Sequence, residues 1–161
     1  MEKPLVVIIM GSASDEEQAK KITERFKLFE IDFVVRVASA HKTVEHLVDI
    51  VRHYDEMARE KLYITIAGRS NGLAGVVDGL TSSPTVTCPP YSQTFAGADI
   101  FSSLRMPEGI SPAVILEPAN VAMFAARLFA PYHPQIKEKL QAYIEDLKKK
   151  VIDADAKFMR I

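Results

Sequence analysis

A histidine and a lysine stand side by side at His41 and Lys42, in the stretch SAHKTV that follows the apolar run FVVRVA. Histidine changes its charge near neutral pH and can act as a general acid or base, whereas lysine is a fixed cation with several hydrogen-bond donors. The pair therefore has the chemistry to move a proton and to hold an anion. The alternative is that Lys42 is a solvated cation in the first turn of a helix and that His41 is structural.

A second candidate loop, GSASD at residues 11–15, follows the apolar run LVVIIM. Its glycine turn leads into a predicted helix N-terminus, where free N–H groups and the hydroxyls of Ser12 and Ser14 favour a phosphate group. The loop matches neither the Walker sequence nor G-x-G-x-x-G, and the alternative is an ordinary Ser or Asp helix cap. Because a run of carboxylates begins at Asp15, we expect a phosphate to lie toward Gly11 and the lysine of the other loop, and Asp15 to accept from sugar hydroxyls.

A third loop, GRSNG at residues 68–72, follows the apolar run LYITIA. Arg69, Ser70 and Asn71 carry donors for a carboxylate or an oxyanion, and a guanidinium can donate two parallel hydrogen bonds. The alternative is that Arg69 begins a helix while Asn71-Gly72 forms a turn. In an open parallel sheet ligands bind beyond the carboxyl ends of the strands, so the three loops together predict one shared site.

Three other histidines compete with His41 for a catalytic role. His46 and His53 lie within a helical pattern, and His133 lies in a turn flanked by prolines. Only His41 follows a predicted strand, where a general acid or base belongs. Scattered histidines without a paired carboxylate motif predict no metal site.

Length, charge and cysteine content narrow the class of protein. The chain has 161 residues, which suits a single domain over 1–161, and a formal net charge of −1, which gives no global attraction to nucleic acid or a membrane. Cys88 is the single cysteine, so an intramolecular disulfide and a cysteine-based metal cluster are excluded. We predict Cys88 to be a buried strand residue beside a Pro-Pro segment that shapes a pocket wall. The first apolar run is too short for a signal peptide or a membrane span, and we expect a cytoplasmic protein.

Short β-branched runs alternate with longer amphipathic segments, which indicates right-handed βαβ units and an α/β fold, a three-layer α/β/α sandwich around a parallel sheet. The predicted strands are 5–10, 33–38, 62–67, 85–88 and 113–117. The predicted helices are 15–29, 43–57, 69–80, 97–105, 119–129 and 134–157. The last helix is long for this chain, so we expect it to pack on a neighbouring subunit; the alternative is that it lies along its own subunit.

Several motifs together resemble one protein family. MGSASD, SAHK, AGRSNGL, the CPP segment and SSLRMPEGISPAVILEP are similar to the PurE family of purine biosynthesis, over almost the whole chain. The likeness is greatest to its class II branch, the 5-aminoimidazole ribonucleotide (AIR) carboxylases. The resemblance implies a flavodoxin-like fold, a homo-octamer in which the terminal helix reaches a neighbour, and a reaction that uses no cofactor, neither ATP nor biotin.

The resemblance also implies roles for individual residues. His41 resembles the catalytic acid or base, and Asp15 resembles the ribose contact. Ser12, Ser39 and Lys42 look like contacts to the phosphate and the ribotide. Gly11 and Ser14 look like part of the same phosphate cradle, and Ser70, Asn71 and Gly72 look like the loop that closes over the base and its carboxylate. Ala40 in SAHK and Arg69 in GRSNG complete the predicted substrate-binding residues.

Two departures separate this sequence from class I members of the family, which are mutases of N5-carboxyaminoimidazole ribonucleotide (N5-CAIR). Class I members carry SAHR and a longer AGGAAHLPG-type loop, whereas this chain has Lys42 and AGRSNGLAG. A compact lysine does not replace a guanidinium fork, so we expect the pocket beside His41 to differ. The prediction is the interconversion of AIR and CO2 with 4-carboxy-AIR (CAIR); the alternatives are mutase activity and a ribotide-binding module without catalysis.

Overall fold

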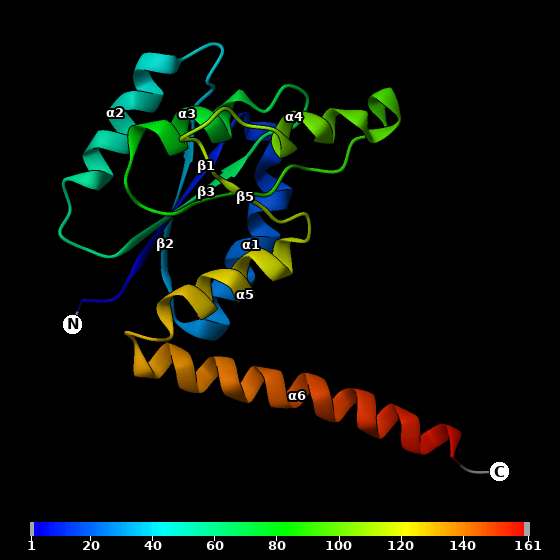
Figure 1. Ribbon diagram of the computed structural model, residues 1–161. Coiled ribbons are helices and arrows are strands. Elements are labelled where there is room, and N and C mark those ends of the chain that lie inside the picture. Colours follow the sequence, from blue (N-terminus) through cyan, green and yellow to red (C-terminus); the bar gives the residue numbers. More distant parts are fainter. Residues whose placement is uncertain (1, 160–161) are drawn as a thin grey trace.

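The computed structural model describes residues 2–159, in which five strands form one parallel sheet with helices on both of its faces (Figure 1). The strands are β1 (Leu5–Met10), β2 (Asp32–Val37), β3 (Lys61–Ile66), β4 (Thr85–Thr87) and β5 (Ala113–Val114). Their order across the sheet is β2-β1-β3-β4-β5, and every neighbouring pair is parallel. This is the flavodoxin-like order of doubly wound folds, so the prediction of an α/β fold with a parallel sheet is confirmed.

Helices cover the sheet in two layers. They are α1 (Glu16–Phe29), α2 (Val44–Asp55), α3 (Gly72–Leu80), α4 (Phe101–Leu104), α5 (Pro118–Phe129) and α6 (Pro134–Phe158), with 3-10 turns η1 (Ala13–Asp15) and η2 (Thr94–Ile100). One apolar cluster joins the sheet to α1, α5 and the start of α6, and another joins it to α2 and α3. Successive residues of β1 point into opposite clusters, Val6 into the first and Val7 into the second. Helix, sheet and helix thus form the three layers.

The burial of each strand follows from its place in the sheet. Every residue of β1 and β3 is buried, because both strands are central and covered on both faces. β2 is an edge strand, and Val35 and Val37 on it are 40% and 43% exposed. The two most apolar runs in the sequence, 5–10 and 62–67, therefore correspond to the central strands β1 and β3. These strands lead into the GSASD and GRSNG loops.

Two predicted boundaries shift for local reasons. β5 ends at Val114 rather than at residue 117, because Glu117 is the N-cap of α5 and Pro118 begins that helix. α3 begins at Gly72 rather than at residue 69, because Arg69 has a left-handed φ of 57° and cannot continue into a right-handed helix.

The predicted helix over residues 97–105 is present in altered form: helical structure runs to Leu104, as the 3-10 turn η2 up to Ile100 and then as α4 over Phe101–Leu104. Phe95, Ala96 and Gly97 have positive φ angles of 53°, 51° and 78°, which a right-handed helix excludes. The chain then turns through the rest of η2 and the four residues of α4 before Arg105 returns to an extended conformation.

The last helix extends away from the rest of the molecule (Figure 1). Ile136 and Leu140 near its start are buried against the core, whereas Val151 and Phe158 near its end are 71% and 85% exposed. An exposed apolar helix end suits a protein partner, and contact with a neighbouring subunit stays a prediction. None of the described helices combines the length and the apolar composition that crossing a membrane requires.

Candidate active site

The carboxyl ends of β1, β2 and β3 lie side by side. Beyond the strands, the N–H of Ala38 donates to the carbonyl of Met10 over 2.9 Å. The N–H of Gly11 likewise donates to the carbonyl of Ile66 over 2.8 Å. β1 has β2 on one side and β3 on the other, and such a switch point is where open α/β sheets bind ligands. The three predicted loops therefore leave the sheet from adjacent positions.

The GSASD loop is closed by its own hydrogen bonds. A Cβ atom at Gly11 would lie 3.3 Å from the Cβ of Ala67, so glycine permits a close approach to the chain after β3. The Ser12 hydroxyl accepts from the N–H of Ser14 (3.3 Å), and the Ser12 N–H donates to an Asp15 carboxylate oxygen (3.2 Å), which makes a capping box. The helix-cap alternative is therefore present in the structure. Both serines remain exposed, so the cap leaves this surface open to a ligand.

Asp15 differs from the two serines because it is half-buried. Burial raises the pKa of the Asp15 carboxyl above its ordinary value, and the hydrogen bond from the Ser12 N–H opposes that shift. A carboxylate that has lost part of its hydration gains from each further hydrogen-bond donor. The position suits the predicted contact with sugar hydroxyls.

The SAHK loop is a tight turn closed by Thr43. The Ser39 N–H donates to the Thr43 hydroxyl (2.9 Å), and the Thr43 N–H donates back to the carbonyl of Ser39 (2.9 Å). The His41 N–H donates to the hydroxyl of Ser39 (3.3 Å). Ala40 is half-buried within the turn, whereas His41 and Lys42 are exposed. The turn therefore fixes the backbone of the histidine and leaves its side chain accessible.

The His41 ring lies against the first residue of α3. A Cβ atom at Gly72 would lie 3.3 Å from His41 Nε2 and 3.4 Å from His41 Cε1. A glycine at this position allows the imidazole to reach the start of the helix. This contact brings the SAHK loop and the GRSNG loop together, as the shared-site prediction requires.

The Asn71 side chain points into the protein. It is 3% exposed, its amide donates to the hydroxyls of Thr87 (2.8 Å) and Ser103 (3.0 Å), and its carbonyl oxygen accepts from the N–H of Ala74 (3.3 Å). The side chain thus caps α3 and ties it to β4 and α4. Because the side-chain amide and the N–H of Asn71 are both engaged, the exposed polar residues of the loop, Arg69 and Ser70, are the ones open to a substrate.

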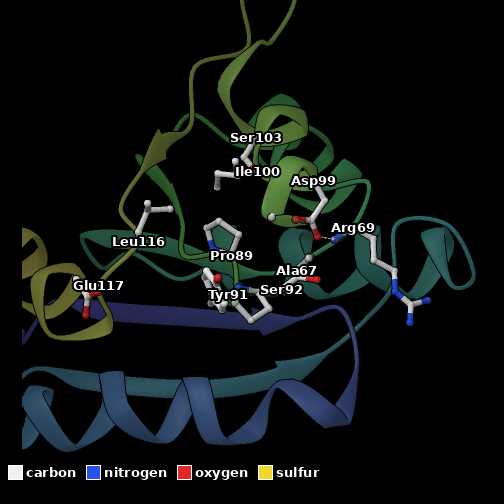
Figure 2. Close-up of a pocket in the computed structure, with 13 residues that line it drawn as sticks. Ala67, Arg69, Pro89, Tyr91, Ser92, Asp99, Ile100, Ser103, Leu116 and Glu117 are labelled. Atoms are coloured by element: carbon white, nitrogen blue, oxygen red, sulfur yellow. Dashed lines mark hydrogen bonds between the residues drawn. The ribbon is translucent and has the colours of Figure 1, made fainter. Parts of the chain in front are cut away.

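Arg69 and Asp99 meet through the backbone (Figure 2). The Arg69 N–H donates to Asp99 Oδ2 over 3.0 Å, while the Arg69 guanidinium extends away from the side chains that line the adjacent cavity. The structure therefore does not bring the Arg69 guanidinium into that cavity, although it was a predicted anion ligand.

A cavity of about 280 Å³ lies at the carboxyl ends of β3, β4 and β5 (Figure 2). Its walls are mainly apolar and include Ala67, Pro89, Pro90, Ile100 and Leu116. The predicted role of the Pro-Pro segment as a pocket wall is confirmed. His41 and the serines of the GSASD loop are not part of this lining, whereas Ala67, Gly68 and Arg69 of the chain that leads to Gly72 are.

Cys88 and the remaining histidines have structural surroundings. Cys88 is buried, as predicted; burial raises the pKa of its thiol to about 11, and its sulfur accepts from the Gln18 amide (3.4 Å). His133 contacts Glu60, and His53 packs edge-to-face on the neighbouring tyrosine ring. Within residues 2–159, no three or more His, Cys, Asp or Glu side chains gather as a metal site requires.

A model of the AIR carboxylase family matches residues 5–150. The chain belongs to the AIR carboxylase family. The phosphoribosylaminoimidazole carboxylase of Treponema denticola is 52% identical over 158 residues, which cover 98% of this chain and 99% of that protein. The phosphoribosylaminoimidazole carboxylase of Archaeoglobus fulgidus is 45% identical over 149 residues, 92% of this chain and 82% of that protein.

The structural comparison agrees with the family assignment. The crystal structure of Treponema denticola PurE is 52% identical in sequence and matches with a TM-score of 0.96, covering 98% of this chain and 100% of that one. A bifunctional phosphoribosylaminoimidazole carboxylase/phosphoribosylaminoimidazole succinocarboxamide synthetase of Mus musculus is 38% identical over 139 residues, 86% of this chain but 33% of that protein. The predictions of a PurE-family enzyme and of its fold are confirmed.

In this member of the AIR carboxylase family, four residues to which the sequence analysis assigned no role organise the site: Thr43, Asp99, Ser102 and Ser103. The role of Thr43 could have been recognised from the sequence, because a threonine just before the apolar positions of a helix is a common N-cap residue. The other three lie 30 to 33 residues from the loop residues that they contact, and no local pattern connects them.

Proposed function

We propose that the chain is a CO2-dependent phosphoribosylaminoimidazole carboxylase, which interconverts AIR and CO2 with CAIR in purine biosynthesis. The observation that carries the catalytic assignment is the contact of His41 with Gly72, whose Cβ position lies 3.3 Å from the ring Nε2. That contact joins the SAHK loop, which carries the proton acceptor His41, to the GRSNG loop, which leads into α3. An accessible imidazole at this junction is suited to general acid and base catalysis.

The phosphate end of AIR is assigned to the GSASD and SAHK loops. Ser12 and Ser14 expose hydroxyls beside the close approach at Gly11, and Lys42 supplies an exposed cation. The half-buried Asp15 accepts from the ribose hydroxyls. Holding the phosphate far from the reacting carbon uses remote binding energy to orient the imidazole ring.

The chemistry begins with the substrate itself, because the exocyclic amine of AIR makes its imidazole an enamine. Carbon C4 of the ring attacks CO2; a C–C bond forms and one C=O electron pair moves onto oxygen to give a carboxylate. His41 then takes the proton from C4, and the ring regains its aromaticity. In the reverse direction protonated His41 returns that proton to C4 and CO2 leaves. Neither ATP nor biotin enters the step.

Ser70 is the loop residue assigned to the developing carboxylate. Among the described residues, neither its hydroxyl nor its N–H has a protein hydrogen-bond partner. The N–H of Arg69, the residue before it, donates to Asp99. The N–H of Asn71, the residue after it, donates to Ser102. Ser70 therefore presents free donors from an anchored loop, which is the arrangement that stabilises developing negative charge.

The apolar cavity at Pro89 and Pro90 is assigned to CO2. A small uncharged molecule loses little hydration on entering apolar walls. The carboxylates of Asp99 and Glu117 also line this cavity and would repel bicarbonate. Both features support CO2 rather than a charged carboxyl donor.

The class of the enzyme and its assembly form part of the proposal. Lys42 and the short AGRSNGLAG loop support the CO2-dependent branch, as do the two phosphoribosylaminoimidazole carboxylases of Treponema denticola and Archaeoglobus fulgidus. The exposed apolar end of α6 supports a homo-oligomer, which we propose to be an octamer in the cytoplasm.

Substitution of the histidine tests this proposal. His41→Asn should bind AIR, measured by titration calorimetry, with wild-type affinity, while CAIR formation from AIR and bicarbonate falls by roughly 10²–10⁴-fold. His46→Asn is the matched control, since His46 is exposed on α2, and it should keep full activity. Wild-type protein that binds AIR but forms no CAIR, and consumes none, would instead be a ribotide-binding module.

A further inference from the structure

We infer that Asp99 is a positioning residue that holds the substrate loop at residues 68–72 in its working conformation. This role rests on the proposed function, because that loop is assigned to the base and its carboxylate. Asp99 lies in η2, 30 residues after Arg69, and accepts the Arg69 N–H through Oδ2 at 3.0 Å (Figure 2). Asp99 makes no contact with His41 in this arrangement and acts through the loop.

Backbone strain explains why the loop needs an anchor. Arg69 has a φ of 57°, in the left-handed region that side chains with a Cβ atom disfavour. Such a conformation persists only where surrounding groups hold it. Asp99 holds the peptide group before Arg69. The Ser102 hydroxyl accepts from the N–H of Asn71 (3.1 Å), and its one hydrogen is shared between the carbonyls of Arg69 and Asp99, each at 2.8 Å.

The anchored positions flank the loop's free donors. Ser70 lies between Arg69 and Asn71, whose backbone groups are both held, so the direction of the Ser70 hydroxyl and N–H depends on these anchors. Gly72 follows directly and touches the His41 ring. If the loop were released from Asp99, the Ser70 donors that bind the substrate carboxylate would be misplaced. The surface at Gly72 against which the imidazole packs would be misplaced as well.

The segment that carries Asp99 has little apolar burial to fix it. Within residues 91–105, all of which the structure describes, only Ser103 is buried, and Phe95 and Ala96 have left-handed φ angles. Asp99 also lines both the 280 Å³ cavity and a neighbouring hollow of about 540 Å³ formed with Ser70 and Phe95. Within one chain, the polar contacts of Asp99, Ser102 and Ser103 thus tie this segment to the loop at residues 68–72.

A double-mutant design tests the positioning role through the strain at residue 69. Asp99→Ala should lower kcat/KM for AIR carboxylation about tenfold, through a lower kcat and a higher KM together. Asp99→Asn should keep most of the activity, because the amide oxygen accepts the same N–H. In an Arg69→Gly background, Asp99→Ala should cost less than about threefold, since glycine adopts a positive φ without strain. In an Arg69→Ala background, which removes the same guanidinium but keeps the strain, the full loss should return.

Asp78→Ala is the matched control for stability. Asp78, in the last turns of α3, accepts one backbone N–H, from Ser111 (2.7 Å), and the hollow that these two residues line includes none of the proposed site residues. It should lower the melting temperature about as much as Asp99→Ala while leaving kcat/KM unchanged.

Three results would overturn the inference: an equal effect of Asp99→Ala in both Arg69 backgrounds, an Asp99→Asn loss as large as that of Asp99→Ala, or full activity of Asp99→Ala. If the wild-type protein forms no CAIR, the proposed function fails by itself. The same variants are then compared by AIR affinity in calorimetry, where the same background dependence is expected and its absence overturns the positioning role.

Discussion

The two loops that flank His41 are held in opposite ways. Apart from the Gly11 N–H, which donates to the Ile66 carbonyl at the sheet edge, GSASD is closed by hydrogen bonds between residues no more than three apart, among them those of its capping box. GRSNG is held by hydroxyls and a carboxylate that lie 16 to 33 residues further along the chain. One side of the site is therefore a local structure, and the other exists only in the folded molecule.

This difference assigns different tasks to the two loops. A locally closed loop suits the phosphate, which must be bound in the same way throughout the reaction. A loop held by a lightly buried segment suits the base and its carboxylate, where charge changes during the reaction. Substitutions in the first loop should therefore affect AIR affinity, whereas substitutions in the second loop or in its distant partners should affect turnover and, to a smaller extent, AIR affinity.

The largest effect on stability is expected from removing the buried side-chain amide of Asn71, which holds the GRSNG loop. Asn71→Ala removes three hydrogen bonds and leaves the buried hydroxyls of Thr87 and Ser103 without this partner, so the free energy of unfolding should fall by about 2–3 kcal/mol. Ser12→Ala, which removes the local cap of the other loop, should cost about 1 kcal/mol. Urea denaturation measures both. A cost for Ser12→Ala equal to that for Asn71→Ala would contradict the contrast between the loops.

The next effect isolates the contact between the two sides of the site. Gly72→Ala places a methyl group 3.3 Å from His41 Nε2, which displaces the ring, and kcat should fall roughly tenfold or more with little change in KM. Gly75→Ala in the same helix is the control, because its methyl group would lie 3.5 Å from the Met106 sulfur, an ordinary contact. Steady-state kinetics in which both variants match the wild type would remove the His41–Gly72 contact from the mechanism.

The smallest effect concerns the locally closed loop and its pH dependence. Because burial raises the pKa of Asp15, the carboxylate protonates at a higher pH than an ordinary aspartate. Protonation removes an acceptor for the ribose hydroxyls, so AIR affinity is full above the raised pKa and falls a few-fold as the pH drops through it. The KM of the wild type is divided by the KM of Asp15→Asn at each pH, because the titration of the ribotide phosphate affects both proteins equally and cancels. This ratio should approach one in acid. A ratio that stays constant with pH would show that Asp15 does not bind the ribose.

The same contrast explains what the sequence alone could predict. The sheet, the convergence of three loops and the access of His41 follow from apolar runs and from the residues that end them, which are local signals. The strain at Arg69 and the anchoring by Asp99 and Ser102 have no local signal, because partners 30 or more residues apart are chosen by the fold. The predicted helix over 97–105 begins only after Gly97, because a left-handed turn at Phe95, Ala96 and Gly97 precedes it, and no helical periodicity in the sequence describes that turn.

In the proposed reaction His41 and the anchored GRSNG loop catalyse the carboxylation of AIR by CO2 itself. The most direct measurement supplies the purified protein with AIR and carbon-labelled bicarbonate, without ATP, and follows the label into CAIR. The account predicts labelled CAIR at a rate that rises with dissolved CO2 and that is lost in His41→Asn. Turnover of N5-CAIR with no label taken up from bicarbonate at high CO2 would contradict it.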